Sequence, residues 1–164
     1  MTQHSDDWDR RVAALWEAID DTPEDEFMAR MEALAAERPD DDPRAEYERG
    51  SAEDSTGHSD RAVPHYRRAL ELGLSGGKRR ECVIQLASSL RNLGDSAESE
   101  RLLREERAAG SDELDDAVDA FRALALVELG REREAVALAL TALAGHMDRY
   151  QRSVRNYAQE VGER

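Results

Sequence analysis

Three stretches of the chain share one template, and this repetition constrains the fold more than any other feature. Each stretch contains a glycine followed five residues later by a small residue, and the glycines are Gly57, Gly94 and Gly130. They are spaced 37 and 36 residues apart, just above the period of about 34 residues that marks stacked helix–turn–helix units. The sequence therefore predicts an all-α fold, an α-solenoid of antiparallel helix pairs, which usually works by binding.

Apolar residues at helical spacing predict further helices on both sides of the glycine-marked region. We expect one helical domain over residues 1–164, with a helix pair over 1–38, three hairpin repeats over 43–143 and a C-terminal capping helix over 146–162. The apolar stripe of the capping helix is predicted from a spacing of four, three and four residues, which joins Tyr150, Val154, Tyr157 and Val161.

Several polar residues precede these helices at positions where side chains cap helix ends. We expect Thr22 to cap the second helix, with Pro23 in its first turn, and Ser59 and Asp95 to cap the second helices of the first two hairpins. The acidic run at 40–42 should favour the positive end of the helix that begins at Pro43.

Charge is distributed unevenly along the chain. The formal net charge is −14, and residues 1–60 alone carry −13. Such a surface repels nucleic acid and anionic lipid, so we expect neither as a partner. The chain has no apolar run long enough for a membrane helix, and its polar N-terminus is unlike a secretory signal. Cys82 is the only cysteine, which excludes an internal disulfide and favours a cytoplasmic location.

The repeated residues resemble those of the tetratricopeptide repeat family, and small bacterial members in particular. The family pattern has a small residue within the first helix of each hairpin, a glycine at the turn, and a small, a larger and a small residue along the second helix. The matching positions are Gly50, Ala87 and Ala123, then the three turn glycines, then Ala62, Ser99 and Ala135, then Tyr66, Leu103 and Ala139, then Ala69, Glu106 and Ala142. The resemblance implies a right-handed superhelix in which small side chains sit where paired helices cross.

The resemblance also implies a ligand groove lined by the first helix of each hairpin. The groove positions carried over are Tyr47, Ser51, Asp54 and Ser55 in the first repeat, Ile84, Ser88, Arg91 and Asn92 in the second, and Ala120, Leu124, Val127 and Glu128 in the third. Ser88, Arg91 and Asn92 fall on one helical face, and an arginine beside an asparagine can bind a carboxylate and a peptide backbone together. One hypothesis is therefore that Arg91 and Asn92 hold an acidic or C-terminal group. The other is that Arg91 pairs with Asp54, its counterpart in the preceding repeat.

Residues that carry catalytic or metal chemistry form no convincing group in the sequence. The four histidines lack the spacing of a metal-binding helix, and Cys82 lies among apolar residues as a packing side chain would. Gly76-Gly77-Lys78 lacks the remaining residues of a phosphate loop and is interpreted as a connector. We therefore expect no cofactor, no metal and no enzymatic activity.

Two functions remain open at this point. The first is a non-enzymatic adaptor or scaffold that binds a protein, as a peptide or helix, in its concave groove. The alternative is a structural protein that self-associates as a homodimer and has no separate peptide ligand. A basic stripe of Arg149, Arg152 and Arg155 on the last helix would meet acidic residues of a second molecule or stay solvated.

Overall fold

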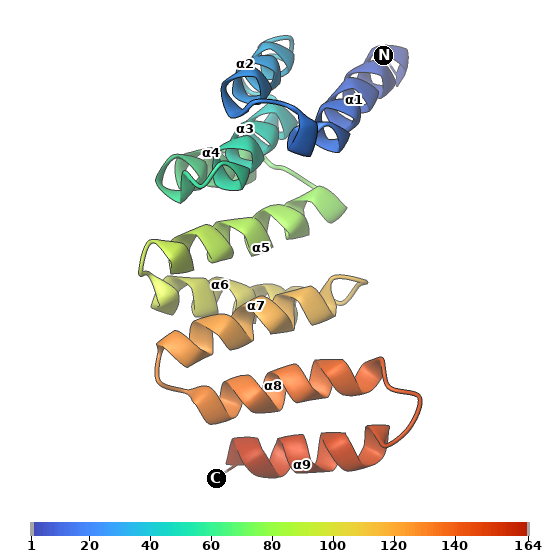
Figure 1. Ribbon diagram of the computed structural model, residues 1–164, viewed down its shortest axis with the longest axis vertical. Coiled ribbons are helices and arrows are strands. Elements are labelled where there is room, and N and C mark those ends of the chain that lie inside the picture. Colours follow the sequence, from blue (N-terminus) through green and yellow to red (C-terminus); the bar gives the residue numbers. More distant parts are fainter. Residues whose placement is uncertain (1, 164) are drawn as a thin grey trace. The chain divides into compact units, whose positions relative to one another are not determined.

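The computed structural model describes residues 2–163, and the side chains of residues 7–163. These residues form α-helices and one 3₁₀ helix, with no strand, so the all-α prediction is confirmed for the described part of the chain (Figure 1). The helices are α1 (Thr2–Glu17), η1 (Ile19–Asp21), α2 (Glu24–Ala35), α3 (Pro43–Ser55), α4 (Ser59–Glu71), α5 (Gly77–Asn92), α6 (Ser96–Ala109), α7 (Asp115–Glu128), α8 (Glu132–Gly145) and α9 (Gln151–Glu163).

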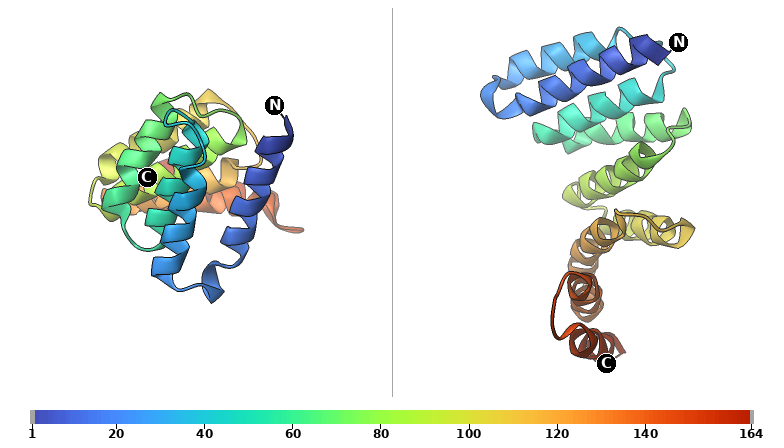
Figure 2. Two further views of the ribbon diagram at one scale, coloured as in Figure 1. Left: turned by 90° about the horizontal axis from the view of Figure 1, so that it is seen from above. Right: turned by 90° about the vertical axis from the view of Figure 1, so that its right-hand side faces the viewer.

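The chain divides into two compact units, Met1–Ser75 and Gly76–Arg164. Unit 1 contains α1 to α4, and unit 2 contains α5 to α9. Within unit 1, α2 packs against both α1 and α3, and α3 packs against α4 (Figure 2). Within unit 2, α5 and α6 pack against each other and against α7, and α8 lies between α7 and α9 (Figure 1).

The apolar stripes of the first two helices form the core of unit 1. Trp8, Val12 and Leu15 of α1 meet Phe27 and Met31 of α2, and all five side chains are buried. This cluster joins the apolar stripes of the two helices and, through Ala52, anchors α1 and α2 beside α3.

A close approach of two helices determines the packing of α3 on α4. A Cβ atom added at Gly50 would lie 2.8 Å from Cδ1 of Tyr66, whose side chain is fully buried. Only a residue without a side chain fits at this distance. The family's small residue in the first helix and its larger residue in the second are therefore in contact in the first repeat.

The polar residues of α3 are accommodated by ion pairs rather than by apolar packing. Arg49 contacts Glu46 at 2.8 Å and Glu32 of α2 at 2.9 Å, while Nδ1 of His65 in α4 lies 2.8 Å from Glu46. These contacts tie α3 to both of its neighbours, so the polar first helix still packs within unit 1.

The three turn glycines adopt the same conformation. Gly57, Gly94 and Gly130 have φ values of 86°, 88° and 71°, a left-handed region that side chains other than glycine rarely enter. At each turn the glycine N–H and the next N–H donate to carbonyls of the preceding helix, for example Gly57 to Asp54 at 3.0 Å and His58 to Glu53 at 2.8 Å. The predicted turn positions are thus confirmed.

The predicted caps are confirmed in part. The Asp95 carboxylate accepts from the Glu98 N–H at 3.2 Å, and the Asp42 carboxylate accepts from the Arg44 N–H at 2.9 Å at the start of α3. The predictions that Thr22 and Ser59 cap the helices that follow them are wrong. Thr22 donates back to the carbonyl of Ala18 at 2.7 Å, and Ser59 donates to the Asp54 carboxylate at 3.0 Å, so each hydroxyl bonds the preceding segment.

The third hairpin departs from the predicted packing. Ala135 is buried against Ala123 and Leu126 of α7, with Leu138 packed beside them, whereas Ala139 is exposed. The expectation that Ala139 lies at the crossing of the paired helices is wrong, because Leu138, the larger side chain, lies against α7 in its place.

The stripe predicted for the last helix is also realised only in part. Val154 and Val161 are half-buried and Ala158 is fully buried, but Tyr157 is 64% exposed. Tyr150 precedes α9 and is 74% exposed, so neither tyrosine is part of the core.

A buried carboxylate ties together three helices of unit 2. Glu100 of α6 has a side chain that is 4% exposed and contacts Arg104 at 2.6 Å and Arg122 of α7 at 2.9 Å. Arg131, which precedes α8, approaches it to 3.9 Å. An ionised carboxylate is stable at such depth only because cations surround it.

Candidate functional site

The predicted groove residues of the first repeat lie in unit 1, on α3. Tyr47 and Ser51 are buried, with 6% and 7% of their surfaces exposed, and the Tyr47 ring packs 6.2 Å from that of Tyr66. Asp54 is half-buried and accepts the hydrogen bond from Ser59. Tyr47 and Ser51 therefore offer little surface to a ligand in this structure.

The predicted groove residues of the second and third repeats lie in unit 2. Ile84 is buried in the cluster that joins α5, α6 and α7 and therefore offers no surface. Ser88 and Arg91 are half-buried and Asn92 is exposed on α5. On α7, Leu124 and Val127 are 48% and 49% exposed.

An ion pair joins these positions into one face. Arg91 Nη1 of α5 lies 2.7 Å from Glu128 Oε1 of α7, and Arg91 Nη2 donates to the Asn92 side-chain oxygen at 3.0 Å. Since Leu124 lies one helical turn before Glu128, its side chain is beside this pair. We define the α5–α7 face as Ser88, Arg91, Asn92, Leu124, Val127 and Glu128.

The electrostatics of this face centre on Glu128. The pKa of its carboxyl lies below the ordinary value, first because the Ser96 hydroxyl donates to it and second because the Arg91 guanidinium donates to it. Arg91 therefore has a described partner in α7. The sequence left Asp54 or a carboxylate of a ligand as the expected partner of Arg91. In the structure, its partner is Glu128.

We expect Arg91→Ala to raise the Glu128 pKa part of the way to its ordinary 4.5, since the Ser96 hydrogen bond remains. Because the folded-state pKa is lowered, the stabilisation from this contact is present above that ordinary value and is lost as pH falls through the folded-state pKa. The melting temperature at neutral pH should change by less than about 2 °C, since Glu128 is 40% exposed and water can replace the arginine. A carboxyl NMR titration measures the pKa, and an unchanged value would contradict the ion pair.

Large apolar side chains that are exposed lie only in unit 2, among the residues whose side chains the structure describes. They are Leu93, Leu124, Val127, Leu129, Val136, Leu143, Tyr150 and Tyr157. Residues 1–75 carry 20 acidic and 9 basic residues, a net charge of −11, whereas residues 76–164 carry 17 and 14, a net charge of −3. Unit 2 therefore combines weak net charge with apolar surface, the composition of a protein-binding surface.

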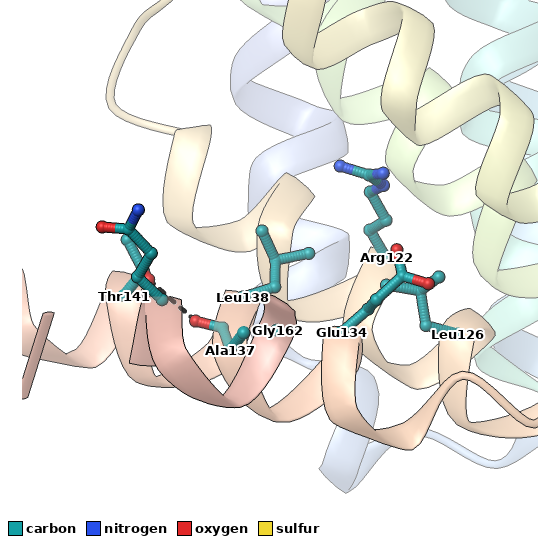
Figure 3. Close-up of a pocket in the computed structure, with 8 residues that line it drawn as sticks. Arg122, Leu126, Glu134, Ala137, Leu138, Thr141 and Gly162 are labelled. Atoms are coloured by element: carbon teal, nitrogen blue, oxygen red, sulfur yellow. Dashed lines mark hydrogen bonds between the residues drawn. The ribbon is translucent and has the colours of Figure 1, made fainter. Parts of the chain in front are cut away.

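A pocket of about 330 Å³ lies among α7, α8 and α9. Figure 3 shows its lining side chains, which include Arg122 and Leu126 of α7, Glu134, Ala137, Leu138 and Thr141 of α8, and Gly162 of α9. Its polar groups already have partners within the chain: Arg122 contacts Glu100, Glu134 contacts Arg131, and Thr141 donates to the Ala137 carbonyl. The pocket thus combines polar groups that already have partners with the apolar side chains of Leu126, Ala137 and Leu138.

Sequence reasoning missed the polar network and the surface of the third hairpin. Glu100 occupies a helix position that resembles any exposed glutamate of α6, and its burial depends on arginines that lie 22 and 31 residues further along the chain. For the exposed surface of the third hairpin, the only signal in the sequence was the apolar composition of residues 135–144, which exceeds what one buried helix face requires.

The described part of the chain holds neither a metal-binding cluster nor a membrane-spanning helix. No cluster of three or more histidine, cysteine, aspartate or glutamate side chains there is suited to a metal ion. None of the helices there combines the length and apolar character that a membrane span requires. Cys82 is buried, and burial raises the pKa of its thiol to about 12.

Paired helices with left-handed glycine turns and close small-residue contacts define a helical-hairpin repeat protein. A family model described as a tetratricopeptide repeat matches residues 43–161, which is most of the chain. The chain therefore belongs to the tetratricopeptide repeat family, as its sequence pattern predicted. The match extends beyond residue 143 and reaches residue 161, within α9. No curated protein and no solved structure matches the chain. Tetratricopeptide repeats are in general modules for protein–protein interaction rather than enzymes.

Proposed function

We propose that the α5–α7 face of unit 2 binds an extended peptide or a helix of a partner protein, without a catalytic step. The observation that carries this proposal is the exposure of Leu124 and Val127 on the helix face joined to α5 by the Arg91–Glu128 pair. Apolar side chains half-open to water on a rigid helix are typical anchors for an apolar side chain of a partner.

The polar members of this face would set the orientation of the ligand. Asn92 is exposed at the edge of the apolar pair, where its amide can form hydrogen bonds with a peptide backbone. A carboxylate of the ligand would compete with Glu128 for Arg91, which makes an apolar residue flanked by an acidic or C-terminal group the best-fitting motif. Tyr47, Ser51 and Asp54 remain predictions for the first repeat.

We expect Leu124→Asp combined with Val127→Asp to reduce capture of the partner at least tenfold, about the effect of losing one anchor residue. A photoreactive amino acid at Ala120, one turn before Leu124, would report capture in lysate of the source organism. Both substituted side chains are half-exposed, so the helical content should be retained.

The matched control places the same photoreactive group at Ala97, an exposed alanine of α6. Adducts at Ala120 that are missing at Ala97, and that disappear with the double aspartate variant, support the proposal. Equal yields at the two positions, or adducts unaffected by the double change, would show that the α5–α7 face is not the binding site.

A further inference from the structure

The helix α8 has more apolar surface than its neighbours cover. Residues 135–144 read AVALALTALA, apolar on every side except for one threonine. A helix that is apolar all round is normally buried all round. In unit 2, α7 covers one face of α8 and α9 covers another (Figure 1), which leaves a third apolar face open to water.

The open face is a stripe at helical spacing. Val136, Ala139 and Leu143 follow one another at intervals of three and four residues, so they share one side of α8. Val136 is 46% exposed and Leu143 is 54% exposed, and Ala139 between them is exposed as well. Leu138, and not Ala139, packs against α7. The side of α8 that carries Ala139, Val136 and Leu143 therefore faces water.

Contacts with α9 extend this face. Arg133, one turn before Val136, donates to the Val161 carbonyl of α9 at 3.1 Å. Tyr157, one turn before Val161, is 64% exposed on the helix that this contact ties to the start of α8. The α8 stripe, defined as Val136, Ala139, Leu143 and Tyr157, combines aliphatic and aromatic side chains, a composition typical of the central part of an interface.

We propose that the α8 stripe binds a second copy of this chain, with the two α8 helices antiparallel about a two-fold axis near Ala139. Val136 lies three residues before Ala139 and Leu143 four residues after it. In an antiparallel pair, each valine would therefore lie opposite the leucine of the other copy. The small Ala139 at the centre allows close approach of the helices. Each contact between two different residues occurs twice, as a two-fold interface requires.

The charges at the two ends of α8 complement each other in this arrangement. Glu132 begins the helix on the same side as Val136, and Arg149 follows its other end. Neither forms an ion pair with another residue in the part of the chain that the structure describes. Antiparallel packing brings the Glu132 end of one copy to the Arg149 end of the other, which a parallel arrangement would not.

Sedimentation velocity over a concentration series tests the proposal. We expect the wild type to show a monomer–dimer equilibrium, and Val136→Glu with Leu143→Glu to raise the dimer dissociation constant at least tenfold. The matched control is Leu124→Asp with Val127→Asp, two similarly exposed apolar residues of α7, which should leave the dimer intact. A wild type that stays monomeric throughout, or a dimer lost only in the α7 variant, overturns the proposal.

Disulfide cross-linking at Ala139 tests the proposed antiparallel arrangement of the two α8 helices. In the proposed dimer the two Ala139 Cα atoms lie near the axis, within the range of about 4–7 Å that a disulfide bridges. Ala139→Cys should therefore form a covalent dimer on mild oxidation at least tenfold faster than Ala97→Cys, and the buried Cys82 thiol should not interfere. Equal rates overturn the arrangement. This result does not depend on peptide capture at the α5–α7 face, so the two proposals fail separately.

Discussion

Replacing Glu100 by alanine is expected to destabilise unit 2 by about 3 kcal/mol, lowering its melting temperature by at least about 12 °C. The Glu100 side chain is 4% exposed, and its removal takes the carboxylate partner away from Arg122, whose side chain is only 20% exposed. An unpaired cation at that depth is costly because water cannot fully solvate it. Far-ultraviolet circular dichroism during heating would measure the loss.

The control for this change is Glu105→Ala on the same helix. Glu105 contacts Arg101 at 2.7 Å, but its side chain is 57% exposed, so water replaces the arginine. Its melting temperature should stay within about 2 °C of the wild type. If the two variants melted alike, burial of the Glu100 carboxylate would not be what makes it important.

Replacing Gly50 by alanine is expected to destabilise unit 1 by about 2 kcal/mol. The new methyl group would lie 2.8 and 2.9 Å from two carbons of the Tyr66 ring, and that ring is enclosed and cannot move aside. The clash outweighs the gain in helix propensity of about 1 kcal/mol that alanine brings over glycine. Both tryptophans of the chain, Trp8 and Trp16, lie in unit 1, so their fluorescence reports this unfolding specifically.

Gly145→Ala is the control for Gly50→Ala, because the added methyl group has room at Gly145. A Cβ atom at Gly145, the last residue of α8, would meet no atom within 4 Å. Alanine there should stabilise α8 slightly, by about 0.5 kcal/mol, through helix propensity alone. If Gly50→Ala were as harmless as Gly145→Ala, the close contact of α3 with Tyr66 would be wrong.

The periodic part of the fold was predictable because each signal is local. A turn glycine and the apolar residues on either side specify a helical hairpin without reference to distant residues, and this predicts α3 to α8 to within a few residues. Tertiary packing decides what lies outside that pattern. Ala139 and Leu138 are adjacent in sequence, and only the rotation of α8 against α7 determines which of them is buried.

The candidate site was predictable only as a set of helix faces. Periodicity placed Arg91, Asn92, Leu124 and Val127 on the first helices of two hairpins, where the structure has them. It could not reveal that Glu128 is the partner of Arg91, because that pairing depends on how α5 and α7 stack. Nor could it show that Tyr47 and Ile84 are buried, since their exposure depends on neighbours in space.

The shared geometry of the turns at Gly57, Gly94 and Gly130 has a consequence for how such a chain changes length. Each turn is closed by hydrogen bonds to carbonyls of the helix just before it. A whole hairpin can therefore be duplicated or deleted in frame without redesign of any connection. Evolution and protein engineers alike can treat one hairpin, together with the glycine turn inside it, as an exchangeable segment.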